Sequence, residues 1–469
     1  MSALPKRTKF AYGLGQIGEQ VKNQGFGTFL FFYFTQVLGL SGSLAGTAIL
    51  IALIFDAVTD PVAGSLSDNW KGSRGRRHPF MYAAAVPLGI SYVILFNPPA
   101  SYGQTGLFIW LTAFAIAVRG AMTLYHVPHL AMGAELSDDY QERTSIVAWR
   151  TMRAVVGGGL VTIASYQLFF PETAQFENGM LNPDGYSRYS VFAALIMIAT
   201  IWYSAYGTRD RIPDMPKAPE SPERFSFQRI VGEFASAWDN ISFRSLFIGF
   251  TLFGIFFGIL GTLGTHVNVF FWEFGTGQLQ FLVLPALIGF AVGSALVGPL
   301  HKRFDKLPTL MFGCIASAFL GNAAIVLRLL GAFPENGSVW LLPVIFTLLL
   351  LNTIIAATSF VSAGSMMADV AEQHVLRSGK AQQGIFFSAT SFSGKMASGL
   401  GHFIAGVGLD WIAFPLESKP SEVSAGAIQS LGLLNLSAGL ITIVAIWVFR
   451  YYRIDREVQL ETRQALLDR

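Results

Sequence analysis

Apolar runs separated by short polar segments recur along this chain of 469 residues. Each run is long enough for an α-helix, which rises about 1.5 Å per residue, to cross about 30 Å of hydrocarbon. The pattern predicts about twelve membrane-spanning helices, and hence an all-α membrane protein. We place the spans at residues 10–39, 42–66, 79–98, 105–134, 145–170, 187–207, 241–272, 278–300, 308–331, 338–367, 382–412 and 426–452.

The longest polar interruption divides this pattern into two halves of about six spans. It carries charges of both signs and Pro213, Pro216, Pro219 and Pro222, a composition typical of a linker. We predict an N-terminal six-helix bundle at 1–207, a cytoplasmic linker at 208–240, a C-terminal six-helix bundle at 241–453 and a cytoplasmic tail at 454–469. Within the linker, residues 225–238 form either a short amphipathic helix on the membrane surface or a solvated loop.

A weak internal repeat supports two related halves. The sequence Gly64-Ser-Leu-Ser-Asp-Asn-Trp-Lys follows the second span of the first half. A degenerate counterpart, Gly298-Pro-Leu-His-Lys-Arg-Phe-Asp, follows the second span of the other half. Halves repeated in parallel predict a binding cavity between them, near the middle of the bilayer.

Composition agrees with the membrane interpretation. Hydrophobic residues make up 52% of the chain and charged residues only 13%, and the mean hydropathy is +0.49. A water-soluble chain with so little charge would aggregate, so a soluble protein is excluded. The single cysteine, Cys314, lies in a predicted span and has no partner for an internal disulfide.

Basic residues predict the orientation through the positive-inside rule. They precede the first span and follow the second and the eighth, at Lys6, Arg7, Lys9, Lys71, Arg74, Arg76, Arg77, Lys302, Arg303 and Lys306. We therefore expect both termini in the cytoplasm and the chain in the cell membrane, as a multi-pass protein of the bacterial inner membrane. The basic loop 71–78 is expected to face lipid headgroups, and it is too short for a nucleic-acid-binding patch.

Two aspartates interrupt an otherwise uncharged apolar run. Asp56 and Asp60 are four residues apart, so both side chains lie on one face of a helix. Ionised carboxylates are costly in hydrocarbon and indicate a functional site, here one for a cation. The alternative is a structural salt bridge to a buried base such as Lys395, Lys22 or Arg119, and the two interpretations are compatible.

Several motifs resemble a known family. They are Asp56-Ala-Val-Thr-Asp-Pro-Val-Ala-Gly-Ser-Leu-Ser-Asp-Asn-Trp, Gly75-Arg-Arg-His-Pro, His126-Val-Pro-His, Gly384-Ile-Phe-Phe-Ser and Ser393-Gly-Lys. This pattern is similar to that of the glycoside-pentoside-hexuronide cation symporters, the melibiose permease-like branch of the major facilitator superfamily. The resemblance implies two six-helix bundles, alternating access, and symport of a sugar-like solute with Na⁺ or H⁺.

The resemblance also implies which residues bind the cation. The matching positions are Asp56, Thr59, Asp60 and Thr123, and Asp56 and Asp60 would be the metal ligands if the ion is sodium. Oxygen ligands suit a hard cation. The third acidic ligand of the family pattern is His126 here, and an imidazole favours proton transfer over sodium binding.

Further matches imply the positions that bind the solute and those that form a gate. Substrate contacts are expected at Glu19, Gln20, His126, Arg150, Ser391 and Lys395. Gln20 replaces a sugar-binding carboxylate of the family, which weakens any claim for a galactoside. Arg150 contacts substrate, closes an inner gate, or is a cytoplasmic anchor that follows the positive-inside rule. The gate is expected at Asp68, Arg153, Asp369 and Glu372.

Some of the same motifs also fit a second class of solute. Gln20, His126-Val-Pro and Lys395-Met-Ala-Ser-Gly are also similar to sodium-dependent lysophosphatidylcholine symporters, so a lysophospholipid or other amphipathic solute is the alternative. The sequence has no zinc-ligand spacing, phosphate-cradling glycine loop or nucleophile elbow. We therefore do not expect an enzyme. We expect no cofactor besides the coupling ion, Na⁺ or H⁺. The protein is expected to be a monomer whose partners are a small-molecule solute and membrane lipid.

Overall fold

The computed structural model describes residues 4–218, 227–378 and 383–468, and within these ranges the chain forms helices and no β-strand. The chain divides into two compact units. Unit 1 comprises residues 1–225, 274–280 and 415–422, and unit 2 comprises residues 226–273, 281–414 and 423–469. The main division lies inside the segment 208–240 that the sequence assigns to a linker.

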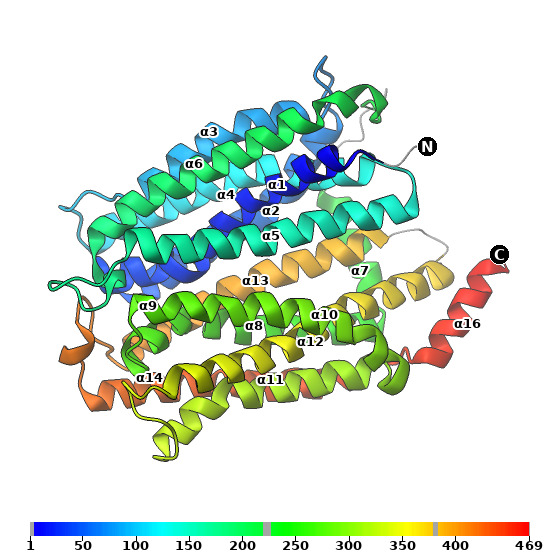
Figure 1. Cartoon of the computed structure of the whole chain (residues 1–469). Helices are drawn as coiled ribbons and strands as arrows, with labels where there is room; N and C mark the ends of the chain where they lie inside the picture. The colour runs from blue at the N-terminus through cyan, green and yellow to red at the C-terminus, as the bar shows by residue number, and fades with distance from the viewer. Residues whose placement is uncertain (1–3, 219–226, 379–382, 469) are drawn as a thin grey trace. The chain divides into compact units, whose positions relative to one another are not determined.

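Unit 1 is a bundle of six long helices (Figure 1). The helix α1 contacts α5 and α6, α4 contacts α2 and α3, and α3 contacts α6. Two π-helical turns, Gly25–Leu30 and Tyr33–Val37, continue α1, and two 3₁₀ turns, Gly179–Leu181 and Arg209–Asp214, flank α6. The helices are α1 (Lys6–Gln24), α2 (Gly42–Asp68), α3 (His78–Leu95), α4 (Gln104–Glu135), α5 (Tyr140–Phe169), α6 (Pro183–Thr208) and the short α9 (Thr276–Leu279).

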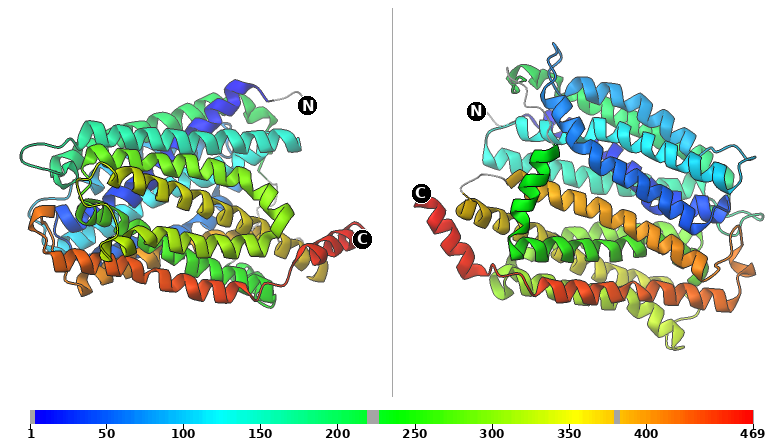
Figure 2. Two further views of the ribbon diagram at one scale, coloured as in Figure 1. Left: turned by 60° about the horizontal axis from the view of Figure 1, so that its bottom comes forward. Right: turned by 180° about the vertical axis from the view of Figure 1, so that it is seen from behind.

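Unit 2 repeats this order of helix pairing. The helix α8 contacts α13 and α15, α12 contacts α10 and α11, and α11 contacts α15. A π-helical turn at Val267–Phe271 continues α8, and a 3₁₀ turn at Gln280–Leu282 precedes α10, whereas the 3₁₀ turn Pro420–Glu422 belongs to unit 1. The helices, also visible from two other sides in Figure 2, are α7 (Phe227–Trp238), α8 (Ile241–His266), α10 (Val283–Phe304), α11 (Lys306–Leu329), α12 (Leu341–Ser378), α13 (Gln383–Trp411), α14 (Ala425–Ser437), α15 (Gly439–Phe449) and α16 (Arg456–Leu467).

The predicted all-α membrane fold is confirmed. Among the described residues, 10 helices are long and apolar enough to cross a membrane. The helix α1 with its π turns, and α13, complete about twelve spans. Of the two interpretations of residues 225–238, the structure agrees with a helix rather than a loop, because residues 227–238 form α7.

The helix α12 is longer than the sequence predicts. The apolar pattern ends at residue 367, whereas the helix continues to Ser378. Its last turns carry Asp369 and Glu372, which pair with Lys306 and Arg463. Hydropathy detects only the part of a helix that lies in hydrocarbon. It therefore missed the polar end of α12, which lies outside the hydrocarbon and is held by ion pairs.

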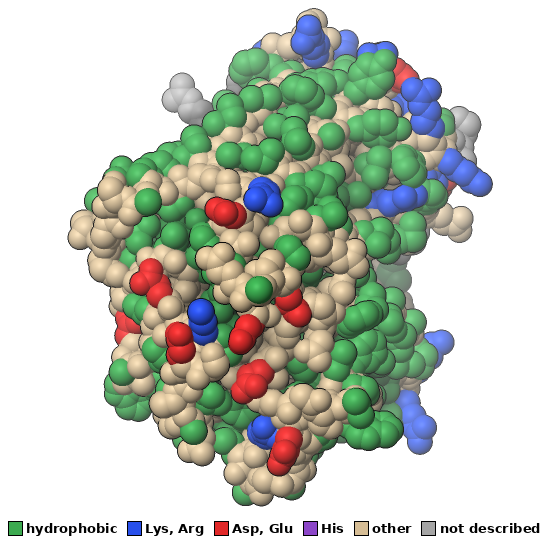
Figure 3. Space-filling view, turned by 60° about the vertical axis from the view of Figure 1, so that its left-hand side comes forward, with side chains coloured by type: hydrophobic (Ala, Val, Ile, Leu, Met, Phe, Trp, Pro, Cys, Tyr) green, Lys and Arg blue, Asp and Glu red, His purple; other side chains and the backbone are tan. Residues whose placement is uncertain are grey.

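Side chains on the outside of both units are apolar. Leu160 and Leu195 in unit 1 are each 61% exposed, and Phe319 in unit 2 is 71% exposed. Exposed apolar faces of this extent indicate contact with lipid. Figure 3 shows acidic side chains gathered on the face that is turned forward. Basic residues gather in the loop after α2 and at the end of α10, at Lys71, Arg74, Arg76, Arg77, Lys302 and Arg303. This charge asymmetry agrees with the positive-inside prediction, and the sidedness of the termini stays a prediction.

Close backbone contact between α8 and α13 depends on two glycines. A Cβ atom built at Gly401 would lie 2.6 Å from the Cα atom of Gly258, whereas a Cβ built at Gly394 on the same helix meets nothing within 4 Å. Because the obstruction at Gly401 is backbone, an added methyl group must separate the two helices.

We therefore expect Gly401→Ala to lower the thermal stability of the protein by about 1–3 kcal/mol and Gly394→Ala to leave it unchanged. Cys314 is buried in the same unit and is the single cysteine of the chain, so the temperature at which its thiol reacts with a fluorogenic maleimide reports unfolding. Equal melting temperatures for the two variants would contradict the close packing of α8 and α13.

Candidate functional site

Asp56 is buried in α2, and its carboxylate meets two side chains of α4. Arg119 Nη1 lies 3.2 Å from Asp56 Oδ2, and Thr123 Oγ1 lies 2.7 Å from Asp56 Oδ1. Arg119 and Thr123 are four residues apart, which places both on the face of α4 toward α2. The Arg119 guanidinium also lies over the ring of Phe26, 4.8 Å from its centroid.

Asp60 lies one turn further along α2 and is half-buried. Its Oδ1 atom is 3.1 Å from Thr123 Oγ1, so one hydroxyl group contacts both carboxylates. Since a hydroxyl has one proton, it donates to one aspartate at a time. Thr59 does not join this group, because its hydroxyl donates to the carbonyl oxygen of Phe55 at 2.9 Å. The structure thus brings together three of the four residues expected to bind the cation.

A second polar group lies between α1 and α4. Gln16 Nε2 is 3.0 Å from Glu19 Oε2 and 3.2 Å from His126 Nε2. Asn23 also donates to Glu19, and Lys22 Nζ lies 2.5 Å from Asn23 Oδ1. Sequence reasoning named Glu19 and His126 but missed Gln16 and Asn23. Their spacing of three and four from Glu19 on one helix was the available signal.

The remaining candidates of unit 1 lie where α1 meets α5. Gln20 packs on Gly158, where an added Cβ would stand 2.2 Å from Gln20 Cγ. Arg150 lies within hydrogen-bonding reach of the Tyr12 hydroxyl. The guanidinium of Arg153, a predicted gate residue, lies over the ring of Phe10, 4.3 Å from its centroid.

A buried aromatic stack inside the bundle supports these polar groups. The His129 ring is fully buried and stacks on Tyr12 and Tyr125, with centroids 4.5 Å and 5.1 Å away. Its Nε2 atom lies 3.0 Å from the carbonyl oxygen of Tyr12. The stack fixes α4 against α1, and so orients His126, which is one turn away on α4.

In unit 2, α13 carries both predicted substrate residues. Ser391 is exposed and Lys395 is half-buried, and their spacing of four puts them on one helix face. Between them, Ser393 Oγ lies 2.6 Å from Thr251 Oγ1 and joins α13 to α8. A second link, Thr262 Oγ1 to His402 Nδ1 at 2.7 Å, fixes the same helix pair farther along.

Three of the predicted gate residues form ion pairs at the ends of helices. Asp68, at the end of α2, pairs with Arg77. In unit 2, Asp369 pairs with Lys306, while Glu372 lies 3.2 Å from Arg463 of α16. Each of these contacts is inside one unit.

Glu135, which the sequence analysis missed, is the unit 1 counterpart of Asp369. It accepts from Arg77 Nη2 at 2.7 Å and from Arg76 Nη2 at 2.8 Å. In both units, therefore, an acidic residue near the end of the fourth helix holds a base that follows the second helix. Aligning the two halves at Asp369 would have found Glu135.

The geometry limits which ions the site can hold. Among the described residues, no group of three or more His, Cys, Asp and Glu side chains lies close enough to hold a metal ion. A hard cation at Asp56 and Asp60 would thus need hydroxyl, carbonyl or water oxygens in addition to the two carboxylates. The hydroxyl of Thr123 is in place for that role.

The chain matches the family model described as MFS/sugar transport protein over residues 11–456. It therefore belongs to this family of major facilitator transporters, and the resemblance to glycoside-pentoside-hexuronide symporters is confirmed. The family consists of transporters rather than enzymes. The chain is accordingly a multi-pass protein of the bacterial inner membrane and a secondary transporter of the sugar type that carries a small-molecule solute.

Curated relatives match nearly the whole chain. The inner membrane symporter YicJ of Escherichia coli (strain K12) is 23% identical, over 96% of this chain and 92% of the relative. The isoprimeverose transporter of Lactiplantibacillus pentosus is 23% identical, over 91% and 84%. Among solved structures, the inward-open xylose transporter XylE from E. coli superposes with a TM-score of 0.58 at 15% identity, covering 98% of each chain. This last likeness concerns the fold alone.

The Asp56–Arg119 pair generates a stability prediction. Removing one member of a buried ion pair leaves the other charge uncompensated, at a cost of about 3–5 kcal/mol. We expect Asp56→Asn to lower the melting temperature strongly, and Asp56→Asn combined with Arg119→Gln to recover much of the loss. Thermal unfolding of the purified protein followed by tryptophan fluorescence measures both, with Asp184→Asn, at the exposed start of α6, as the control. Strictly additive losses would show that the two side chains do not depend on each other.

Proposed function

We propose that this protein is a symporter that couples uptake of a sugar-like solute, a glycoside, pentoside or hexuronide, to entry of a cation by alternating access. The proposal is supported by the grouping of Asp56, Asp60, Thr123 and Arg119 inside an apolar bundle, and by relatives whose names describe symporters and sugar transporters. No cofactor takes part, and the single chain acts as a monomer.

The observation that best supports this proposal is that one hydroxyl, that of Thr123, contacts the carboxylates of both Asp56 and Asp60. A cation that binds Asp60 replaces the hydroxyl proton on that carboxylate and takes the Thr123 oxygen as a ligand. The proton is then left for Asp56, which changes the hydrogen bonding of Asp56 and its pairing with Arg119. Binding at the α2 aspartates is thereby communicated to α4. His126 lies on the same helix and belongs to the polar group with Glu19, so α4 connects the proposed cation site to the proposed solute site.

Arg119 reconciles the two interpretations of the aspartate pair. In the described arrangement Asp56 is balanced by a fixed base, as the structural interpretation requires. The same bridge is a proposed resting state, in which Arg119 stabilises the carboxylate until an ion arrives. A purely structural bridge would need only Asp56, whereas the second carboxylate one turn away, sharing Thr123, favours a cation role.

The coupling ion is Na⁺ or H⁺. Two carboxylates and a hydroxyl offer oxygen ligands for Na⁺. Proton coupling has its own support, because His126 stands where the family pattern has an acid and is 3.2 Å from Gln16 Nε2. Transport measurements should therefore first identify the coupling ion.

For the solute we propose contacts from Glu19, Gln20, His126 and Arg150 of unit 1 and from Ser391 and Lys395 of unit 2. Amide, imidazole and carboxylate groups suit sugar hydroxyls, and a guanidinium or ammonium group suits an acidic sugar. Relatives with sugar-transporter names favour this assignment over the lysophospholipid alternative. Asp68, Arg153, Asp369 and Glu372 are the proposed gate residues.

Uphill transport tests the cation site. We expect Asp60→Asn to abolish accumulation of solute against its gradient, because the ion loses a ligand, while the protein stays folded. Uptake into proteoliposomes with an imposed Na⁺ gradient or pH gradient measures this, and Asp184→Asn should accumulate solute normally. Full accumulation by Asp60→Asn would sink the cation assignment.

Coupling of ion and solute is reciprocal, which generates a second expectation. Solute affinity should rise by about 5-fold to 150-fold when the coupling ion is saturating. Counterflow with a panel of glycosides, uronates and lysophospholipids, repeated at several Na⁺ concentrations and pH values, measures the affinity and identifies the solute. Affinity that is constant under all ion conditions would contradict symport, and saturable lysophospholipid uptake without any sugar response would select the alternative solute.

A further inference from the structure

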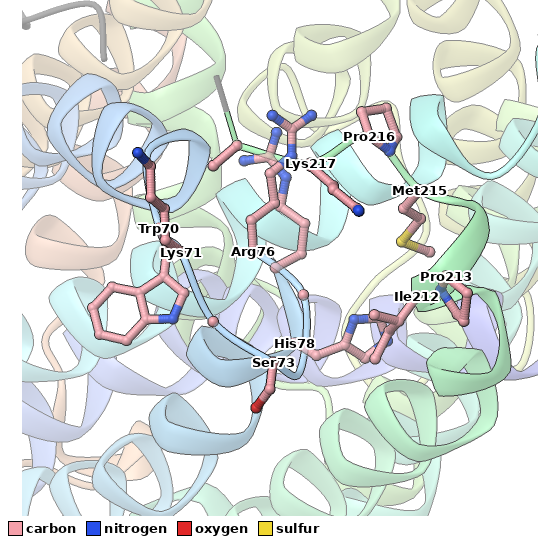
Figure 4. Close-up of a pocket in the computed structure, with 14 residues that line it drawn as sticks. Trp70, Lys71, Ser73, Arg76, His78, Ile212, Pro213, Met215, Pro216 and Lys217 are labelled. Carbon is pink, nitrogen blue, oxygen red and sulfur yellow. The ribbon is translucent and has the colours of Figure 1, made fainter. Parts of the chain in front are cut away.

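A cavity of about 530 Å³ lies in unit 1, apart from the proposed transport site. Figure 4 shows its lining, with Trp70 of the loop between α2 and α3 on one side and Met215, which follows α6, on the other. The volume is within the range of small-ligand pockets, about 300–1,000 Å³. The proposed transport mechanism does not use this space, and its link to the proposed gate is Arg77, which lines the cavity and pairs with Asp68.

The lining is strongly basic. Lys71, Arg76, Arg77 and Lys217 all line the cavity, and no aspartate or glutamate is among its lining residues. Glu135 and Asp68 neutralise part of this charge, since both pair with Arg77 and Glu135 also pairs with Arg76. Within the described ranges, Lys71 and Lys217 form no ion pair, and both are exposed. The cavity therefore keeps excess positive charge that an anion would balance.

Buried polar atoms of the lining also have unused hydrogen-bonding capacity. His78 is 1% exposed. Its Nε2 atom lies 3.0 Å from Thr208 Oγ1, but its Nδ1 atom has no partner among the described residues. Arg76 Nε is likewise buried without a partner there. Unpaired buried polar atoms are rare, and a bound ligand or water normally explains them.

The walls are held in place by packing. Gly75 has φ of +74°, and a Cβ added there would lie 3.0 Å from Ile212 Cγ2, so the loop turns tightly against the segment after α6. The Trp70 ring meets Phe80 edge-on, with centroids 5.4 Å apart. The cavity is thus formed by two ordered segments rather than by one isolated loop.

We propose that this cavity binds a phosphate-bearing anion. Several N–H donors with excess positive charge suit a phosphate group, which is a multiple acceptor. The source with most support is the headgroup of an anionic membrane lipid. Trp70, a residue type enriched at the membrane interface, is 44% exposed, and Leu66, one turn before it, is 48% exposed. A soluble phosphate ester has the same chemistry and is separated from lipid by the test.

Binding is measured by native mass spectrometry of the purified full-length protein, titrated with phosphatidylglycerol, with phosphatidylcholine of the same acyl chains, or with glycerol phosphate. We expect phosphatidylglycerol to bind about tenfold or more tightly than the zwitterionic lipid. Lys71→Gln with Lys217→Gln should weaken that binding about thirtyfold, since each lysine near an anionic headgroup contributes about 1 kcal/mol. Lys71→Arg with Lys217→Arg should retain it.

The matched control is Lys6→Gln with Arg7→Gln, which removes the same charge from exposed positions of the same unit. Its affinity should stay within about twofold of the unmodified protein. Competition by glycerol phosphate supports a soluble ester as the source, and binding of lipid without such competition supports a headgroup. The proposal is overturned if neither phosphatidylglycerol nor glycerol phosphate binds saturably and preferentially. It is also overturned if Lys71→Gln with Lys217→Gln loses no more affinity than Lys6→Gln with Arg7→Gln.

Discussion

The arrangement of unit 1 depends on balancing charge that is buried in an apolar bundle. An isolated carboxylate in hydrocarbon is costly, so Asp56 can stay ionised only with partners close by. Arg119 and Thr123 supply them from α4. The pairing of α2 with α4 is therefore decided by polar contacts as well as by apolar packing, and any change of charge at the aspartates acts directly on the contact between these two helices.

The same constraint appears at the helix ends, where it has a structural use. Glu135 in unit 1 holds Arg77 at the end of the loop between α2 and α3, and Asp369 in unit 2 holds Lys306, the first residue of α11. Each pair ties the fourth long helix of its unit to the start of the third or to the residue just before it. This kind of contact recurs in both units, although its residues lie outside the weak sequence repeat of 64–71 and 298–305.

Polar groups of different kinds are thus separated along α4. Arg119 and Thr123 face the aspartates of α2, His126 faces the polar group of α1, and His129 is buried in an aromatic stack. One helix carries the proposed cation site, the proposed solute site and a rigid support in successive turns. Such an order allows a change at one site to reach the next without movement of the whole bundle.

The sequence alone determined the all-α membrane fold and singled out Asp56 and Asp60 as candidates, because apolar run length and isolated intramembrane charge are local properties of the chain. Only the tertiary structure decided which partners these charges have. Arg119 lies against Asp56, the hydroxyl of Thr59 donates to a carbonyl oxygen of its own helix, and Glu135 completes a pair that the sequence analysis missed. The polar end of α12 escaped prediction for the same reason, since contacts between residues far apart in sequence depend on how helices pack, and hydropathy carries no information about packing.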